Sequence, residues 1–234
     1  MTEDWENGGF GIYIHWPFCT AKCPYCDFNS HVRSNINQKQ WLKAYLNEIK
    51  RVSEKTSNRI LNSVFFGGGT PSLIEPSIIG DVLNEIQKHW KTKNNFEVTL
   101  EANPGSVDAK NFKAYKEAGV NRTSMGIQSL NTKDLKALGR THTVEEALAA
   151  FEIARQNFKA VSFDLIYARQ NQNISQWEKE LSLALSLEAS HMSLYQLTIE
   201  QGTAFGDRYN RGLLKGLPND CLLYTSPSPR DTRR

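Results

Sequence analysis

Short apolar runs alternate with amphipathic stretches along most of the chain. Runs typical of strands occupy residues 11–16, 63–66, 96–102, 121–128, 161–167 and 191–197. Between them, apolar side chains recur every three or four residues, as in residues 38–52, which is typical of helices with one buried face. The strand runs are mixed apolar rather than cleanly alternating, as expected when both faces of a sheet are covered. The pattern predicts six strands separated by helices.

Local signals at the helix ends support this division. Thr143 followed by Glu146, and Ser175 followed by Glu178, both fit the capping box that begins a helix. Gly119 follows a predicted helix and is suited to end it.

Strands that alternate with helices are joined as parallel neighbours through right-handed crossovers. We therefore expect an α/β fold, and a partial (β/α)6 TIM-type barrel fits six such units best. A doubly wound sheet is the alternative, because the order of elements along the chain is the same in both.

Composition narrows the class of protein. The chain has 234 residues, of which 39% are hydrophobic and 23% charged, so a disordered chain and a disulfide-rich miniprotein are excluded. No apolar run approaches 18 residues and the N-terminus is polar, which predicts a cytoplasmic protein. The net charge is +3, but residues 221–234 contribute +2 of it. The nearly neutral remainder gives no indication of nucleic-acid binding.

We divide the chain into three parts. Residues 1–9 are an expected N-terminal extension, and residues 10–220 form the predicted core domain. Residues 221–234 lack any apolar period, contain two Ser-Pro pairs and resemble a translated sequencing adapter, so we expect them to be an artefact and give Cys221 no role. A natural disordered terminus is the alternative.

Three cysteines follow the first predicted strand. Cys19, Cys23 and Cys26 form a C-x3-C-x2-C motif, which is too compact for a disulfide framework. Thiolates this close together suit a metal or an iron–sulfur cluster, and three of them would leave one iron of a [4Fe–4S] cluster open. The alternative is a structural Cys3His zinc site completed by His31 or His15.

Polar and glycine residues recur where the predicted strands end. The second strand ends at residues 67–70, which read Gly-Gly-Gly-Thr, and the third ends at Glu101. Gln128 ends the fourth strand, and Asp164 lies in the fifth. Ligands bind at the carboxyl ends of strands in barrels and open α/β sheets, so these residues indicate a site. Taken one at a time, a turn or a solvated charge explains each equally well.

The segment IYIHWPFCTAKCPYCDFNSH, residues 12–31, resembles the cluster loop of radical S-adenosylmethionine (SAM) enzymes. Within that group, it is similar to the oxygen-independent coproporphyrinogen III oxidase family, and the similarity extends from about Phe10 to about Asp220. The resemblance implies a partial barrel of the radical SAM type. It also implies that Cys19, Cys23 and Cys26 hold a [4Fe–4S] cluster whose open iron binds SAM.

Further SAM contacts follow from the resemblance rather than from spacing. The set includes Tyr25, which lies between two of the cysteines, and Thr70, which follows the glycine run. The implied SAM-binding set comprises Tyr13, Tyr25, Gly68, Gly69, Thr70, Glu101, Gln128, Arg140 and Asp164. A guanidinium such as that of Arg140 can hold a carboxylate in a bidentate manner.

Phe28 distinguishes between branches of the family. The oxidases carry a fourth cysteine two residues after the third, where this chain has Phe28, and the CDFNSH run resembles the heme-chaperone branch instead. That branch implies heme binding, transfer to hemoproteins, an electron donor for the cluster and possible peripheral membrane association. We assign no catalytic residue and leave enzymatic activity open. A coproporphyrinogen III oxidase and a zinc-stabilised binding module are the alternatives.

Two departures from the family are visible. The C-terminal heme-binding domain of the family is expected to be absent from this chain. After Tyr167, a turn that usually contains proline is replaced by Ala168-Arg169-Gln170, which predicts a less rigid loop.

Overall fold

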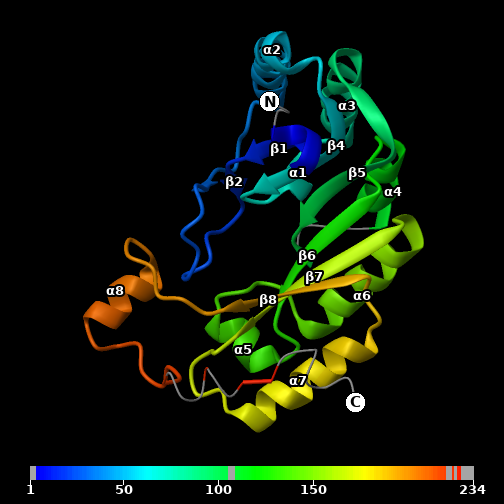
Figure 1. Cartoon of the computed structure of the whole chain (residues 1–234). Coiled ribbons are helices and arrows are strands. Elements are labelled where there is room, and N and C mark those ends of the chain that lie inside the picture. The colour runs from blue at the N-terminus through cyan, green and yellow to red at the C-terminus, as the bar shows by residue number, and fades with distance from the viewer. Residues whose placement is uncertain (1–3, 105–108, 220–222, 224–225, 228–234) are drawn as a thin grey trace.

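A six-stranded parallel sheet forms the centre of the computed structural model, which describes residues 4–104, 109–219, 223 and 226–227. The spatial order β1-β4-β5-β6-β7-β8 follows the chain order (Figure 1). The strands are β1 (Phe10–Trp16), β4 (Ile60–Gly68), β5 (Lys91–Ala102), β6 (Arg122–Gln128), β7 (Ala160–Tyr167) and β8 (His191–Gln196). A doubly wound sheet reverses its order at a switch point. The uninterrupted order therefore rules out that alternative and confirms the predicted partial barrel.

The long helices connect successive strands and lie along one side of the sheet (Figure 1). They are α2 (Gln38–Thr56), α3 (Pro76–His89), α4 (Ala109–Glu117), α6 (Val144–Asn157) and α7 (Ile174–Ser186). The core lies between these helices and the sheet. Phe66 on β4 and Phe163 on β7 are buried there, and the Phe163 ring meets the edge of Phe151 from α6 at 5.5 Å between centroids.

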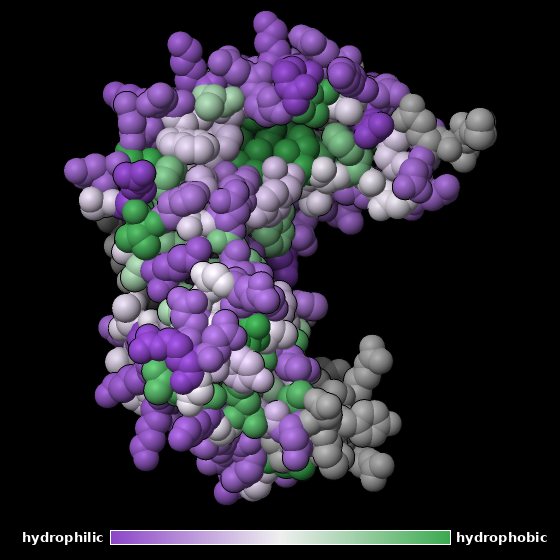
Figure 2. Space-filling model, turned by 90° about the vertical axis from the view of Figure 1, so that its left-hand side faces the viewer, coloured by the Kyte–Doolittle hydropathy of each residue, from purple (hydrophilic) through white to green (hydrophobic). Residues whose placement is uncertain are grey.

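The other face of the sheet is polar and open. On β7, Phe163 and Leu165 point to the core, whereas Ser162 and Asp164 alternate with them and belong to the opposite face. β1 and β8 each have a strand on one side only, so the sheet curves without closing into a full barrel. In Figure 2 the upper, coloured part of the molecule overhangs a hollow on one side.

Several short elements were not predicted because each is too short to show a repeated apolar pattern. They are α1 (Asp4–Gly8), β2 (Phe18–Cys19), β3 (His31–Val32), the 3-10 turn η1 (Pro71–Leu73), α5 (Thr132–Ala137) and α8 (Ala204–Asn210). Of these, β2 and β3 pair with each other and close the loop that carries the cysteines.

The helix ends confirm one predicted cap and correct the other. Thr143 and Glu146 form the predicted capping box of α6. In α7, however, the box is formed by Asn173 and Gln176, two residues before the predicted pair. Asn173 has the extended backbone of a cap residue, with φ −105° and ψ 167°, so Ser175 falls inside the first turn.

The structure describes only a few residues near the C-terminal end of the chain. Within residues 221–234, only Leu223, Ser226 and Pro227 are described, and the Pro227 carbonyl accepts a hydrogen bond from the Trp177 indole at 2.9 Å. Cys221 lies outside the described residues. Among the helices that the structure describes, none is long and apolar enough to cross a membrane.

Candidate functional site

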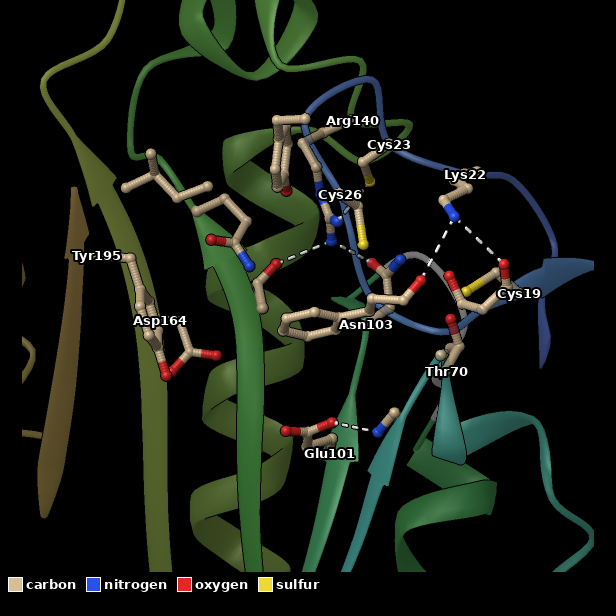
Figure 3. A pocket seen from close by; sticks show the side chains of 18 of the residues that line it. Cys19, Lys22, Cys23, Cys26, Thr70, Glu101, Asn103, Arg140, Asp164 and Tyr195 are labelled. Carbon is tan, nitrogen blue, oxygen red and sulfur yellow. Dashed lines mark hydrogen bonds between the residues drawn. The ribbon is translucent and has the colours of Figure 1, made fainter. Parts of the chain in front are cut away.

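A cavity of about 270 Å³ opens at the carboxyl ends of the strands (Figure 3). Of the twelve residues predicted to bind a cluster or SAM, eleven line it. They are Cys19, Cys23, Tyr25, Cys26, Gly68, Gly69, Thr70, Glu101, Gln128, Arg140 and Asp164. Parallel strands bring these positions together because their carboxyl ends share one edge of the sheet.

Tyr13 is the exception, because it does not line this cavity. Its side chain is 56% exposed on β1, where its ring stacks against Phe65 at 6.1 Å between centroids and its hydroxyl lies 3.2 Å from Nδ1 of His15. Partial burial, and then the nearby Glu101 carboxylate, raise the pKa of Tyr13. Tyr13 therefore neighbours the site rather than facing into it, and its contact with a ligand stays a prediction.

Hydrogen bonds hold the cysteine loop together, both where its two ends meet and within the loop. The His31 amide donates to the Pro17 carbonyl at 2.7 Å, and the Arg33 amide donates to the Cys19 carbonyl at 3.3 Å. Within the loop, the Lys22 ammonium donates to the carbonyls of Phe28 at 3.4 Å and Ser30 at 3.3 Å. These contacts hold an otherwise irregular segment over the cavity.

The three sulfurs are unbonded thiols that face a common space. Cys19, Cys23 and Cys26 are all free of disulfides, and the Cys26 amide donates to the Cys23 carbonyl at 3.1 Å, which turns the two side chains to one side of the loop. Burial raises the pKa of the Cys26 thiol. Among the described residues, no three His, Cys, Asp or Glu side chains are grouped so as to hold a single metal ion.

Glycines let the end of β4 lie directly against the strand that leads to Cys19. The Gly69 amide donates to the Trp16 carbonyl at 2.6 Å, and a Cβ on Gly69 would lie 2.5 Å from the Phe18 carbonyl oxygen. Gly68 has φ +118°, a backbone conformation that side chains disfavour. The glycine run is thus more than a turn, because any larger residue would push the two segments apart.

Glu101 lies at the end of β5, pointing into the cavity beneath the glycine run (Figure 3). Its Oε2 accepts a hydrogen bond from the Gly68 amide at 3.1 Å. Burial raises the pKa of this carboxyl to about 7, the Gly68 hydrogen bond acts in the opposite direction, and the Asp164 carboxylate adds to the increase. A cation placed between the two carboxyl groups would restore the charged form of Glu101.

Arg140 links the cysteine loop to the strand ends. Its Nη1 donates to the Cys23 sulfur at 3.2 Å, and its Nη2 donates to the Asn103 side-chain oxygen and to the Gly126 carbonyl, both at 2.9 Å. Both terminal nitrogens are therefore engaged, and a bidentate grip on a ligand carboxylate would exchange these partners. Its Nε is buried without a hydrogen-bond partner.

Gln128 and Asp164 complete the far side of the cavity. Gln128 has φ 71°, and its buried Oε1 has no hydrogen-bond partner. Burial raises the pKa of Asp164, against the hydrogen bond from Ser193 and the charge of Arg122, which lower it. The unpaired Oε1 of Gln128 is a buried acceptor, which costs free energy unless a ligand donates a hydrogen bond to it.

Other lining residues were absent from the predicted set. Ser124 and Gly126 precede Gln128 at alternate positions of β6, so a period of two on that strand would have found them. Lys22 lies between Cys19 and Cys23, so its place in the cysteine motif could have indicated it, whereas Tyr195 on β8 carries no local signal.

Known proteins resemble the chain in sequence. The model of the radical SAM superfamily matches residues 13–184. The protein is 42% identical over 219 residues to the heme chaperone HemW of Haemophilus influenzae, which covers 91% of this chain and 56% of that protein. It is 39% identical over 210 residues to radical S-adenosyl methionine domain-containing protein 1, mitochondrial, of Danio rerio, with 89% and 47% covered. The chain thus spans about half the length of these curated relatives.

Solved structures support the fold. The coproporphyrinogen III oxidase HemN from Escherichia coli, described as a radical SAM enzyme, superposes with a TM-score of 0.79 at 23% identity, covering 91% of this chain and 49% of that one. A native anSMEcpe structure with bound AdoMet superposes with a TM-score of 0.59 at 17% identity, covering 80% and 52%. At these identities the likeness concerns the fold alone.

Proposed function

The chain belongs to the radical SAM superfamily, and from this premise we propose that it is the cofactor-binding core of a heme chaperone. The proposal rests above all on the convergence of three cysteine thiols, two carboxyl groups and a guanidinium on one cavity. Superfamily membership implies a [4Fe–4S] cluster and SAM. The role in heme transfer is supported by the name of the relative that is 42% identical to this chain.

The donor set fits the two implied groups. Cys19, Cys23 and Cys26 supply the soft ligands that an iron–sulfur cluster requires, and they leave one iron without a protein ligand. Bound there, the cluster and SAM supply one-electron chemistry, the reductive cleavage of SAM. The two hydrogen bonds from the Lys22 ammonium to backbone carbonyls keep the loop closed around the cysteines.

The remaining residues complement the charges of SAM, which carries a sulfonium, an ammonium and a carboxylate. We assign Glu101 and Asp164 to its cationic and hydroxyl groups, and Arg140 to its carboxylate. The unpaired Oε1 of Gln128 offers a further acceptor, while Gly68, Gly69 and Thr70 let the ligand approach the backbone. Tyr13 would join this set only if a ligand extends beyond the cavity.

The proposed partners are heme, the hemoproteins that receive it and an electron donor for the cluster. Phe28 lines the cavity with a side chain that is 59% exposed, where the oxidases of the resembled family carry a cysteine. This difference is our reason to favour a chaperone over a coproporphyrinogen oxidase. A cytoplasmic location and peripheral association with a membrane remain predictions.

The proposal is tested by reconstituting the chain anaerobically with iron and sulfide and recording EPR spectra of the reduced protein with and without SAM. We expect a [4Fe–4S] signal that shifts when SAM is added. Cys19→Ala, Cys23→Ala and Cys26→Ala should each fail to retain the cluster, whereas Thr20→Ala, an exposed change within the same loop, should keep full iron content. Full iron and sulfide in any cysteine variant would refute the assignment.

The same preparation separates the alternatives. Titration with hemin, followed by visible absorption, tests whether this chain binds heme by itself, and transfer of that heme to an apo-hemoprotein would support the chaperone role. No band with hemin would refute heme binding by this chain. A colourless protein loaded with zinc would point to a binding module, and turnover of coproporphyrinogen III would restore the oxidase.

A further inference from the structure

A buried cluster of charged side chains lies behind the cavity and outside the predicted site. Arg169 is only 4% exposed and Glu180 only 8%, although both residue types are rarely buried. Arg169 follows β7, in the turn where the family usually has proline, and Glu180 lies on α7. Neither residue lines the cavity. Their burial requires an explanation, because charges inside a protein are costly unless they are paired.

Glu180 holds the segment that leaves β6. One of its oxygens, Oε1, accepts hydrogen bonds from the Ser129 hydroxyl and the Leu130 amide, both at 2.7 Å. Ser129 is completely buried and directly follows Gln128, whose positive φ is a strained conformation for a residue other than glycine. Anchoring the next two residues fixes that strained backbone, and with it the direction in which the Gln128 side chain leaves the strand.

Arg169 connects Glu180 to the end of β7 and to α5. Its Nη1 donates to the Ile166 carbonyl near the end of β7, two residues after Asp164. Its Nη2 donates to the other oxygen of Glu180 and, at 2.8 Å, to Asp134 on α5. The turn that was predicted to be less rigid is therefore held by Arg169 itself.

Through α5, the cluster also reaches Arg140. Asn131 caps this helix and its amide donates to the Ser129 hydroxyl at 3.1 Å, so the helix begins at the segment that Glu180 anchors. The helix ends just before Arg140, whose amide donates to the Leu135 carbonyl at 2.8 Å. Gln128 and Arg140 thus stand at the two ends of a segment that contains α5 and is tied to Arg169 through Asp134.

We propose that Glu180 and Arg169 are positioning residues for SAM, holding Gln128 and Arg140 in place for the ligand without touching it. This inference rests on the proposed function of the cavity. On this proposal, different residues retain the cluster and set the affinity for SAM. The cysteine loop retains the cluster, whereas the Glu180–Arg169–Asp134 cluster sets the affinity for SAM.

The test is the Glu180→Gln variant of the full chain, reconstituted with iron and sulfide. The amide oxygen can still accept one hydrogen bond, but the charge opposite Arg169 is lost. We expect the Kd for SAM, measured by equilibrium dialysis, to rise by about 10- to 100-fold, the effect usual when the partner of a ligating side chain is lost. Iron content should stay near the wild-type level, because the cysteine loop keeps its backbone hydrogen bonds and its Lys22 contacts even if the contact between Arg140 and Cys23 changes. Unchanged SAM affinity would overturn the proposal.

Two controls exclude a general loss of stability. Leu185→Ala removes a half-buried apolar side chain from the same helix, and it should lower the melting temperature without changing the Kd for SAM. In a Gln128→Ala background, Glu180→Gln should raise the Kd by a smaller factor than it does in the wild type, because the part of the effect that acts through Gln128 is already lost and substitutions at coupled residues are not additive. An equal loss of affinity in Leu185→Ala, or full additivity with Gln128→Ala, would contradict a positioning role.

Ser129→Ala provides the milder variant if Glu180→Gln does not fold. It removes one hydrogen bond to Glu180 and should weaken SAM binding by about 3- to 10-fold, as expected for one lost hydrogen bond, with full iron content. Wild-type affinity in this variant would contradict the proposal. If the wild-type protein itself bound no SAM, the proposed function would fail, and that outcome is distinct from a variant that binds as well as the wild type.

Discussion

At the scale of single residues, two neighbouring carboxyl groups control the charge of the cavity. Burial raises the pKa of Glu101 to about 7 and also raises the pKa of Asp164. The carboxyl group of Glu101 is therefore partly protonated near neutral pH. Because its pKa in the folded protein exceeds the ordinary value of 4.5, its contribution to stability is complete below pH 4.5 and is lost as the pH rises through about 7.

This shift predicts that SAM binding strengthens as the pH rises. Only the ionised carboxylate attracts a cationic ligand, so with a pKa of about 7 the Kd for SAM should fall by about fivefold between pH 6 and pH 7, by about tenfold in all by pH 8, and level off above that. Glu101→Gln should weaken binding at pH 8 and remove this pH dependence. Glu97→Gln is the control, because Glu97 lies on the same strand but does not line the cavity. A wild-type Kd that does not vary with pH would contradict the assignment of Glu101.

At the scale of secondary-structure elements, the start of each helix depends on which polar residue takes the extended backbone. Both Asn173 and Ser175 are followed three residues later by a side chain that can complete a capping box. The sequence pattern alone does not choose between them. In the structure, the Asn173 side chain accepts a hydrogen bond from the Gln176 amide at 2.9 Å. The cap of α7 therefore lies two residues earlier than predicted.

The two candidate caps differ in their expected effect on stability. Asn173→Ala should lower the free energy of unfolding by about 1 kcal/mol, because it leaves amide groups of the first turn unpaired. Ser175→Ala should change it by less than about 0.5 kcal/mol, because this residue is an exposed position within the helix. Urea denaturation of the two variants would measure both values, and a larger loss for Ser175→Ala would show that the predicted cap is the one used in solution.

At the scale of the whole molecule, the cysteine loop is docked onto the sheet through backbone contacts that leave no room for side chains. A Cβ at Gly69 would lie within 3 Å of the nitrogen, carbon and oxygen of the Phe18 backbone, at 2.9, 2.8 and 2.5 Å. Phe18 directly precedes Cys19. The site therefore depends on how closely the end of β4 approaches β2.

Gly69→Ala should accordingly disturb both stability and cluster assembly. We expect it to lower the free energy of unfolding by about 1–3 kcal/mol, as overpacking does, and to reduce the iron retained after reconstitution. Gly80→Ala on α3 is the matched control, because its nearest neighbour lies at an ordinary 3.8 Å. It should raise stability by about 0.5–1 kcal/mol through helix propensity. Full iron retention by Gly69→Ala would show that the loop adapts.

Much of the fold and site follows from local sequence. Hydrophobic periodicity is sufficient for the six strands and the long helices, since a buried face leaves a regular trace in the chain. The spacing of Cys19, Cys23 and Cys26 is sufficient to indicate a metal or cluster centre. Parallel strands share one edge, so Glu101, Gln128 and Asp164 could be expected together from their places at or near the ends of strands. Short elements such as α5 escaped prediction because six residues are too few to show a repeated apolar pattern.

Other features were decided only by the tertiary structure. Tyr13 lies outside the cavity, on β1 beside Phe65 and His15, and no local pattern in the chain records that placement. The raised pKa of Glu101 depends on burial and on Asp164, 63 positions further along the chain. No local pattern marks Arg169 and Glu180 as buried, yet they are buried partners. Sequence alone determined the features that repeat locally or share a strand end, whereas contacts between distant segments depend on how the whole sheet and its helices pack.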